Sequence, residues 1–235
     1  MKREYKLILL IYIAMQLSSP IIISLLALVY NNLNPSGDQF FQTTRVSWTV
    51  FSFFFTLLIS VYLLRKERTA HNALPISTSI IWAITGIFLA FIAQSAGILT
   101  ETLLGIEQGS ENTQNILAVI ESMPIFIVVV SIFGPILEEI VFRKIIFGTL
   151  YQRMNFLMAG LVSSLIFAIA HMEFEHIILY SFMGFTFAFL YVKTSRIIVP
   201  IFAHVTMNTL VIVVQLFLSD KLPEQASTIF SCLPF

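Results

Sequence analysis

The chain contains few charged residues and almost no cysteine. Asp, Glu, Lys and Arg make up only 11% of its 235 residues, whereas a soluble domain carries about 25%. Hydrophobic residues make up 57% of the chain, and the mean hydropathy is +0.90. A soluble core cannot bury this much apolar surface, so the composition predicts an all-α polytopic membrane protein. The single cysteine, Cys232, excludes a disulfide within the chain.

The chain also lacks the motifs of several large hydrolase classes. It has no HExxH zinc-protease motif, no GxSxG nucleophile elbow and no glycine-rich loop that cradles phosphate. Ser163 and Ser164 have no base at the spacing that nucleophilic catalysis needs. Any hydrolytic chemistry is therefore expected to use direct attack by water.

Long apolar runs predict a bundle of about seven transmembrane helices, since each span needs about 20 mostly apolar residues. The spans are expected at 7–30, 46–64, 78–100, 118–140, 157–171, 176–192 and 197–218. The fourth is expected to continue as a helix to Tyr151, and the polar segment 107–115 is expected to be an external loop. Ionisable residues within spans concentrate in the C-terminal half. This predicts supporting helices over 1–115, a catalytic core over 116–218 and a tail over 219–235.

The charged residues outside the spans predict the orientation. Basic residues cluster near the N-terminus and after the second, fourth and sixth spans, at Lys2, Arg3, Lys6, Arg65, Lys66, Arg68, Arg143, Lys144, Arg153, Lys193 and Arg196. The alternate loops carry acidic residues and a single arginine, at Asp38, Arg45, Glu101, Glu107, Glu111, Glu173 and Glu175. By the positive-inside rule, seven crossings place the N-terminus in the cytoplasm and the C-terminus outside.

Two adjacent glutamates, Glu138 and Glu139, lie in the otherwise apolar run PIFIVVVSIFGPILEEIVFRKIIFG. A charged side chain at membrane depth costs about 2.5–3.5 kcal/mol on insertion scales, so these residues indicate a functional site. Residues four apart share a helix face, which predicts a pair between Glu139 and Arg143. Glu138 then points about 100° away, toward the bundle interior. The alternative is a structural ion network near the cytoplasmic interface, but one acid suffices for that.

Three more polar side chains follow in apolar surroundings. His171 ends the run SSLIFAIAH, with Phe167 one turn earlier on the same face. His204 and Asn208 are four apart in IFAHVTMNTL and therefore share a face. Each also fits a packing role, as a histidine at a helix end or as an interhelical hydrogen-bonded pair. Straight spans place the two histidines at different depths, because about 14 helical residues cover roughly 21 Å. Convergence requires a deeper or tilted fifth helix, or a site in mid-membrane.

Taken together, these residues resemble the motifs of a known family. The segments EEIVFR, FAIAH and HVTMN are similar to the EExxxR, FxxxH and HxxxN (or HxxxD) motifs of the CPBP family, each on a separate helix. That family, also called Abi, comprises the type II CAAX prenyl endopeptidases and bacteriocin-processing relatives. The resemblance covers about residues 118–218 and implies an intramembrane endopeptidase built on a helical bundle.

The resemblance also implies roles for individual residues. Glu138 would activate a water, His171 would assist it, and His204 with Asn208 would stabilise the oxyanion. The supporting residues would be Glu139, Arg143 and Phe167. The resemblance favours a mechanism without a cofactor. A zinc-dependent mechanism with Glu138, His171 and His204 as ligands also stays open, because catalytic zinc sites use three protein ligands and a water.

We therefore expect an endopeptidase of a bacterial cell membrane. Its partners would be membrane lipid and a peptide or membrane-protein substrate, lipidated or not, cleaved near a hydrophobic segment, with no nucleic acid. One alternative is a non-catalytic immunity or regulatory partner, whose function Glu138→Gln would leave intact. Another is a transporter or proton relay, against which the two halves show no inverted repeat.

Overall fold

The computed structural model describes residues 1–30, 38–67, 70, 72–107 and 109–217, and every regular element in these residues is a helix. The expected tail at 219–235, which includes Cys232, lies outside the described residues, as does Arg68. Three long apolar helices come first: α1 (Arg3–Tyr30), α2 (Asp38–Leu64) and α3 (Ile76–Leu103). The expectation of a helical membrane protein is confirmed.

Six helices in the described residues are long and apolar enough to cross a membrane, rather than about seven. After α3 these are the segment Pro124–Tyr151, a segment ending in α8 (Ile177–Thr194), and α9 (Ile198–Phe217). The fifth expected span, 157–171, forms α7 (Phe156–Ala170), which has only 15 residues. A helix of that length is about 22 Å long and is shorter than the roughly 30 Å hydrocarbon core.

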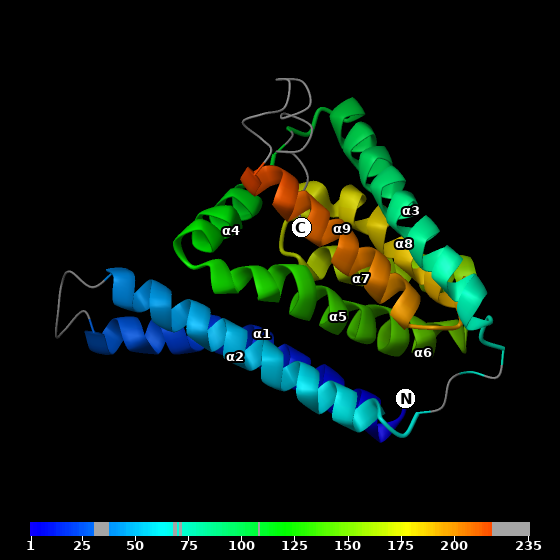
Figure 1. Cartoon of the computed structure of the whole chain (residues 1–235), viewed down its shortest axis with the longest axis horizontal. Coiled ribbons are helices and arrows are strands. Elements are labelled where there is room, and N and C mark those ends of the chain that lie inside the picture. Colours follow the sequence, from blue (N-terminus) through cyan, green and yellow to red (C-terminus); the bar gives the residue numbers. More distant parts are fainter. Residues whose placement is uncertain (31–37, 68–69, 71, 108, 218–235) are drawn as a thin grey trace.

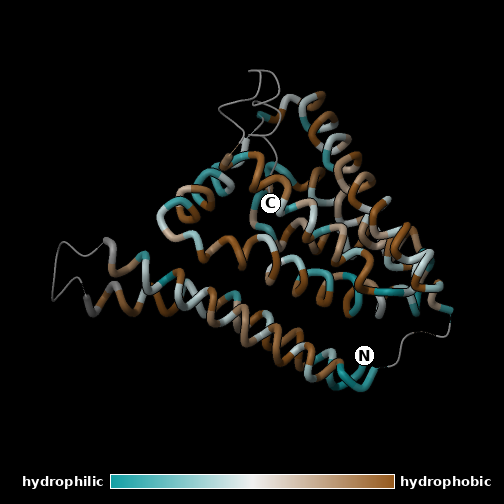
Figure 2. The backbone as a smooth tube through the Cα atoms, in the orientation of Figure 1, coloured by the Kyte–Doolittle hydropathy of each residue, from teal (hydrophilic) through white to brown (hydrophobic). Residues whose placement is uncertain are grey.

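The expected fourth span, 118–140, is wrong at its N-terminal end, because the structure contains two helices there. The amphipathic helix α4 (Glu111–Ser122) begins inside the segment expected as a loop. Its N-cap Ser110 accepts a hydrogen bond from the Thr113 backbone N–H. The helix ends before Pro124, which has no N–H to continue it. Hydrophilic residues occupy much of α4, unlike the long helices (Figure 2).

The chain then continues as one helical segment, Pro124–Tyr151. It comprises η1 (Pro124–Phe126), η2 (Val129–Phe133), α5 (Gly134–Glu138), η3 (Glu139–Phe147) and α6 (Gly148–Tyr151). The parts η2 and η3 have π-helical geometry, with wider turns than an α-helix. A short turn, η4 (Phe174–His176), connects α7 to α8.

The helices form two groups (Figure 1). The long helices α1 and α2 lie side by side as a hairpin along one side of the molecule. On the other side α3, α7, α8 and α9 pack around one another, and the Pro124–Tyr151 segment lies between them and the hairpin. In the most apolar stretch of α1 and of α2, 17% of the residues are buried, compared with 56% in α9. The helix α9, which carries His204 and Asn208, is therefore much more buried than the hairpin.

Glycines allow the closest approaches within this larger group. A Cβ atom at Gly97 of α3 would lie 2.6 Å from the Leu179 Cα of α8, and one at Gly184 of α8 would lie 3.0 Å from the Ser164 Cα of α7. Both distances are to backbone atoms, so a side chain at either glycine would force the helices apart. The two glycines therefore fix α8 against α3 and α7, and His171 is the C-cap of α7.

Candidate active site

The Pro124–Tyr151 segment carries both glutamates at a change of helical geometry. Glu138 is the last residue of α5, and Glu139 is the first residue of η3. The turn of 100° per residue expected from an α-helix therefore does not describe η3. Glu139 and Arg143 still contact each other, with 3.3 Å between Oε2 and Nε. π-Helical turns widen the helix locally and occur often at functional sites.

Glu139, Arg143 and His204 form a buried charged network. The side chains of Glu139 and Arg143 are 0% exposed. His204 Nδ1 lies 3.0 Å from Glu139 Oε1, so its N–H donates to the carboxylate. The spacing predicted the contact between Glu139 and Arg143, but not that of His204 with the same carboxylate. This contact fixes the tautomer of neutral His204 and directs Nε2 toward Glu138.

Glu138 lies between the two histidines. Its Oε2 is 4.0 Å from His171 Nε2 and 3.9 Å from His204 Nε2. The His171 Nδ1–H donates to the Phe167 carbonyl oxygen at 2.8 Å, which leaves Nε2 of this ring facing Glu138 as well. The difference in depth expected from straight spans is therefore absent. The helix α7 is short enough to end level with the first half of α9.

Aromatic rings hold these side chains in position. Phe167 makes an edge contact with the His171 ring, at 4.4 Å between centroids, and lies under the Arg143 guanidinium, also at 4.4 Å. Tyr180 stacks on His171 at 4.0 Å, and Phe187 stacks on His204 at 4.6 Å. The spacing to His171 predicts the supporting role of Phe167. The sequence does not predict the contacts of Tyr180 and Phe187, because nothing in it relates α8 to the motif residues.

A cavity of about 320 Å³ opens onto Glu138, His171 and Asn208. Asn208 Nδ2 donates to the Val130 carbonyl oxygen at 3.4 Å, whereas its Oδ1 is buried without a partner among the described residues. The remaining wall comes from α1, α2, α4 and the Pro124–Tyr151 segment, and includes Tyr12, Gln16, Phe53, Asn112, Phe126 and Pro135. The hairpin thus supplies one side of the cavity, whereas the sequence predicts only a supporting role for it.

The residues proposed as zinc ligands face one another but are too far apart for tetrahedral coordination. Zinc lies about 2.0–2.2 Å from its nitrogen and oxygen ligands, which brings tetrahedral ligand atoms closer together than the 3.9 and 4.0 Å observed here. Among the described residues, no group of three or more His, Cys, Asp or Glu side chains is arranged to hold a metal ion.

A second buried pair lies apart from the predicted site. Glu101, counted from the sequence among external loop residues, is 0% exposed in the last turn of α3. It accepts hydrogen bonds from His176 Nδ1–H and from the Leu179 backbone N–H, both at 2.9 Å. His176 Nε2 lies 3.1 Å from the Gly109 carbonyl oxygen. No local sequence pattern predicts this ion pair, because the two residues are 75 positions apart.

Several known proteins are similar to this chain in sequence. The model of the Rce1-like type II CAAX prenyl endopeptidase family matches residues 120–210. Over 97% of its length the chain is 47% identical to a protein named as a membrane peptidase, YdiL, of Bacillus subtilis (strain 168), and covers 96% of that protein. It is 42% identical to the membrane-embedded CAAX protease MroQ of Staphylococcus aureus (strain USA300), over 63% of this chain and 64% of MroQ. No solved structure matches.

The chain therefore belongs to the Rce1-like family of type II CAAX prenyl endopeptidases. It is an integral membrane protein and a CAAX prenyl endopeptidase-like membrane protease. This confirms the family that the three motifs resemble.

Proposed function

We propose that the protein hydrolyses a peptide bond within the membrane by direct attack of water, with Glu138 as the base. The position of Glu138 Oε2, about 4 Å from two imidazole nitrogens and open to a cavity, is the observation that carries this proposal. A water that bridges the carboxylate and an imidazole in a bent arrangement fits this separation. Glu138 takes its proton as the oxygen attacks the substrate carbonyl.

Charge balance supports a role for the two histidines as the proton donors. Glu138, Glu139 and Arg143 together carry one net negative charge. Because an uncompensated charge in a low-dielectric interior is costly, one added proton on His171 or His204 makes the cluster neutral. That proton sits at Nε2, since both Nδ1 atoms already donate. It can pass to the leaving amine, and the proton on Glu138 then moves to the imidazole that has lost its own, which restores both groups before the next cycle.

The oxyanion is stabilised from α9. Asn208 lines the cavity, and its amide nitrogen makes only a long 3.4 Å hydrogen bond to Val130. It can therefore turn toward a stronger acceptor, namely the oxygen of the tetrahedral intermediate. His204 precedes Asn208 by one turn and contributes from the buried side, where it is 1% exposed. Substrates are peptides or membrane proteins with a hydrophobic or lipidated segment near the cleaved bond, because lipid-facing helices surround the site.

The experiment is a comparison of new peptide N-termini in bacterial membranes that carry wild-type protein or Glu138→Gln at equal expression. Glutamine is nearly isosteric but is not a base, so cleavage is expected to fall by about 10²–10⁴-fold. Glu121→Gln, on the exposed face of α4, is the matched control and is expected to cleave normally. Addition of a zinc chelator is expected to leave the wild-type termini unchanged.

Each other outcome has a distinct meaning. Identical termini in wild type and Glu138→Gln, with the variant still rescuing a deletion phenotype, would replace catalysis with an immunity or regulatory role. Loss of termini on chelation would instead indicate metal-dependent chemistry.

The same cells allow a test of the orientation. Cysteine labelling is expected to place the N-terminus in the cytoplasm, as the basic clusters predict.

A further inference from the structure

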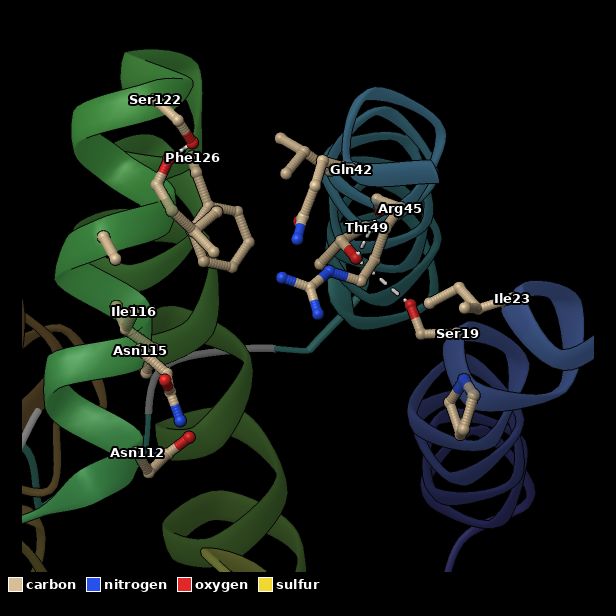
Figure 3. Close-up of a pocket in the computed structure, with 14 residues that line it drawn as sticks. Ser19, Ile23, Gln42, Arg45, Thr49, Asn112, Asn115, Ile116, Ser122 and Phe126 are labelled. Atoms are coloured by element: carbon tan, nitrogen blue, oxygen red, sulfur yellow. Dashed lines mark hydrogen bonds between the residues drawn. The ribbon is translucent and has the colours of Figure 1, made fainter. Parts of the chain in front are cut away.

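A second cavity, of about 860 Å³, lies between the α1–α2 hairpin and α4 (Figure 3). We call it the vestibule. Several lining residues also line the active-site cavity, namely Ser19, Thr49, Asn112, Ile116 and Phe126. The two cavities therefore meet, and a chain bound at Glu138 can continue into the vestibule without leaving the protein.

Arg45 projects into the vestibule from α2 (Figure 3). The sequence placed it in a loop, but α2 begins at Asp38, so Arg45 lies within the helix. The other cations near the bundle interior have partners in the protein. Arg143 contacts Glu139, Lys144 contacts Glu67, and the Arg196 side chain donates to the Leu74 carbonyl oxygen. No carboxylate among the described residues forms an ion pair with Arg45.

The surroundings of Arg45 favour an anionic ligand. A cation on a spanning helix normally pairs with an anion or reaches water, and this one is half-buried and directed into a cavity. The Asn115 and Gln42 amides share the lining. Glu173 is not one of the lining residues, and it accepts a hydrogen bond from Asn112 Nδ2 at 2.8 Å. The vestibule thus offers a guanidinium and amide donors, which is the chemistry that binds a carboxylate.

The helix α2 relates Arg45 to Phe53, which lies near Glu138, since a Cβ atom at Gly134 would be 3.9 Å from both Phe53 Cε1 and Glu138 Oε1. Phe53 lines the active-site cavity and lies eight residues after Arg45 on α2, which is about 12 Å along the helix. An extended peptide spans about 3.3–3.6 Å per residue. A substrate group at Arg45 therefore lies about three or four residues from the peptide bond at Glu138.

We infer that the vestibule is a substrate subsite in which Arg45 binds a carboxylate three or four residues from the cleaved bond. This inference rests on the proposed function and adds a preferred substrate class, namely peptides with an acidic group at that distance. The carboxylate is that of an Asp or Glu side chain, and binding of a free C-terminus is the outcome that the experiment must exclude.

The test uses full-length protein in liposomes and a library of hydrophobic peptides with randomised positions. Cleavage products identified by mass spectrometry give the residue preference at each distance from the cut. Wild type is expected to favour Asp or Glu over Asn or Gln by about tenfold, three or four residues away. Arg45→Gln is expected to lose this preference, and Arg45→Glu to favour Lys or Arg instead. Arg65→Gln, just beyond the other end of α2, is the matched control and is expected to behave as wild type.

A second library with amidated C-termini distinguishes the two carboxylate sources. The preference for Asp or Glu is expected to survive amidation, and its loss would overturn the assignment of the ligand to a side chain. Unchanged preferences in Arg45→Glu, while Glu138→Gln abolishes cleavage, would overturn the subsite and leave the proposed function intact.

Binding to the Glu138→Gln protein tests recognition without cleavage. The probes are acetylated, amidated heptapeptides of alternating Leu and Asp or of alternating Leu and Asn, and the readout is the fluorescence of Trp48, three residues from Arg45. The Asp peptide is expected to bind about tenfold more tightly, and this difference is expected to disappear in Glu138→Gln/Arg45→Gln. Equal binding of the two peptides to Glu138→Gln would overturn the subsite whatever the cleavage result.

Discussion

The N-terminal hairpin and the C-terminal helices are similarly apolar, but they bury very different fractions of their apolar residues. In α1 and α2, 17% of the most apolar stretch is buried, compared with 50% in the Pro124–Tyr151 segment and 44% in the span that ends with α8. The hairpin therefore presents most of its apolar surface to lipid. The C-terminal helices bury apolar surface around a polar cluster instead. Hydropathy alone does not distinguish the two regions, whereas the buried Glu139, Arg143 and His204 of the C-terminal helices do.

The two regions also contribute different parts of the candidate active site. In the proposed mechanism, the C-terminal helices supply the reacting groups and the network that orients them. The hairpin supplies Tyr12, Phe53 and Arg45 to cavity walls. We therefore expect changes in the core to affect folding and catalysis together, and changes in the hairpin to affect substrate choice or attachment.

The largest effect is expected from Glu139→Gln, which removes the carboxylate that contacts the buried Arg143. Breaking a buried pair in this way costs about 3–5 kcal/mol of stability. Activity is also expected to disappear, because His204 loses the carboxylate that orients Nδ1. Denaturant unfolding in micelles measures the first effect, and peptide cleavage measures the second.

The double variant Glu139→Gln/Arg143→Met separates these two roles. It removes both charges and is expected to recover most of the stability while staying inactive. Equal stability of the single and double variants would contradict a buried ion pair at this position.

A smaller effect is expected from Glu101→Ala, at the junction of α3 and α8. Both ring nitrogens of His176 face acceptors, Glu101 and the Gly109 carbonyl, so the ring must carry both protons to satisfy them. Removing the carboxylate leaves the His176 ring and the Leu179 N–H without their partner, at a cost of about 1–3 kcal/mol. Because η4 and His176 follow His171 closely, we also expect a partial loss of cleavage, measured as kcat/KM.

The control for Glu101→Ala is Glu107→Ala, which changes an exposed glutamate after α3. It is expected to change neither stability nor cleavage. If Glu101→Ala behaved like the control, the His176 contact would be irrelevant to the position of His171.

How much of this molecule the sequence predicts depends on the range of the interaction. Spacing of four residues predicts that Glu139 contacts Arg143, and it places His204 and Asn208 on one face, because neighbours on a helix are set locally. It cannot reveal that His204 contacts Glu139, 65 residues away, or that His176 contacts Glu101. These contacts depend on how helices pack, and hydropathy carries no information about that.

The same limit explains the errors at element boundaries. The apolar residues of α4 were joined to the next span, because an amphipathic helix and the start of a spanning helix look alike over a few residues. Arg45 was placed in a loop because a charge usually ends a span. In the structure α2 continues past it toward the N-terminus, and this places the guanidinium in the vestibule. The residue whose position the sequence mispredicts, Arg45, is thus the one proposed to bind the substrate carboxylate.

The smallest effect is expected from Glu67→Gln, which acts where the hairpin is attached to the core. Glu67 forms ion pairs with Lys2 at 2.6 Å and with Lys144 of η3 at 2.8 Å. Burial raises the pKa of the Glu67 carboxyl, but the hydrogen bonds from Lys144 and Lys2 lower it more, so that the pKa lies below the usual 4.5. A carboxyl with a depressed pKa stabilises the fold above its unfolded pKa and loses that contribution as pH falls through the folded value.

Glu67→Gln is therefore expected to lower the stability by less than about 1 kcal/mol at pH 7, because the group is partly exposed. The difference from wild type should shrink as the pH falls below about 4.5. Unfolding midpoints at pH 7 and pH 3.5 measure this, with Glu121→Gln as the control. Cleavage at pH 7 is expected to stay within about twofold of wild type, since a weaker attachment of the hairpin leaves the Glu139–Arg143–His204 network in place. A large loss of cleavage would instead mean that the hairpin positions the catalytic groups, and the division between the two regions would fail.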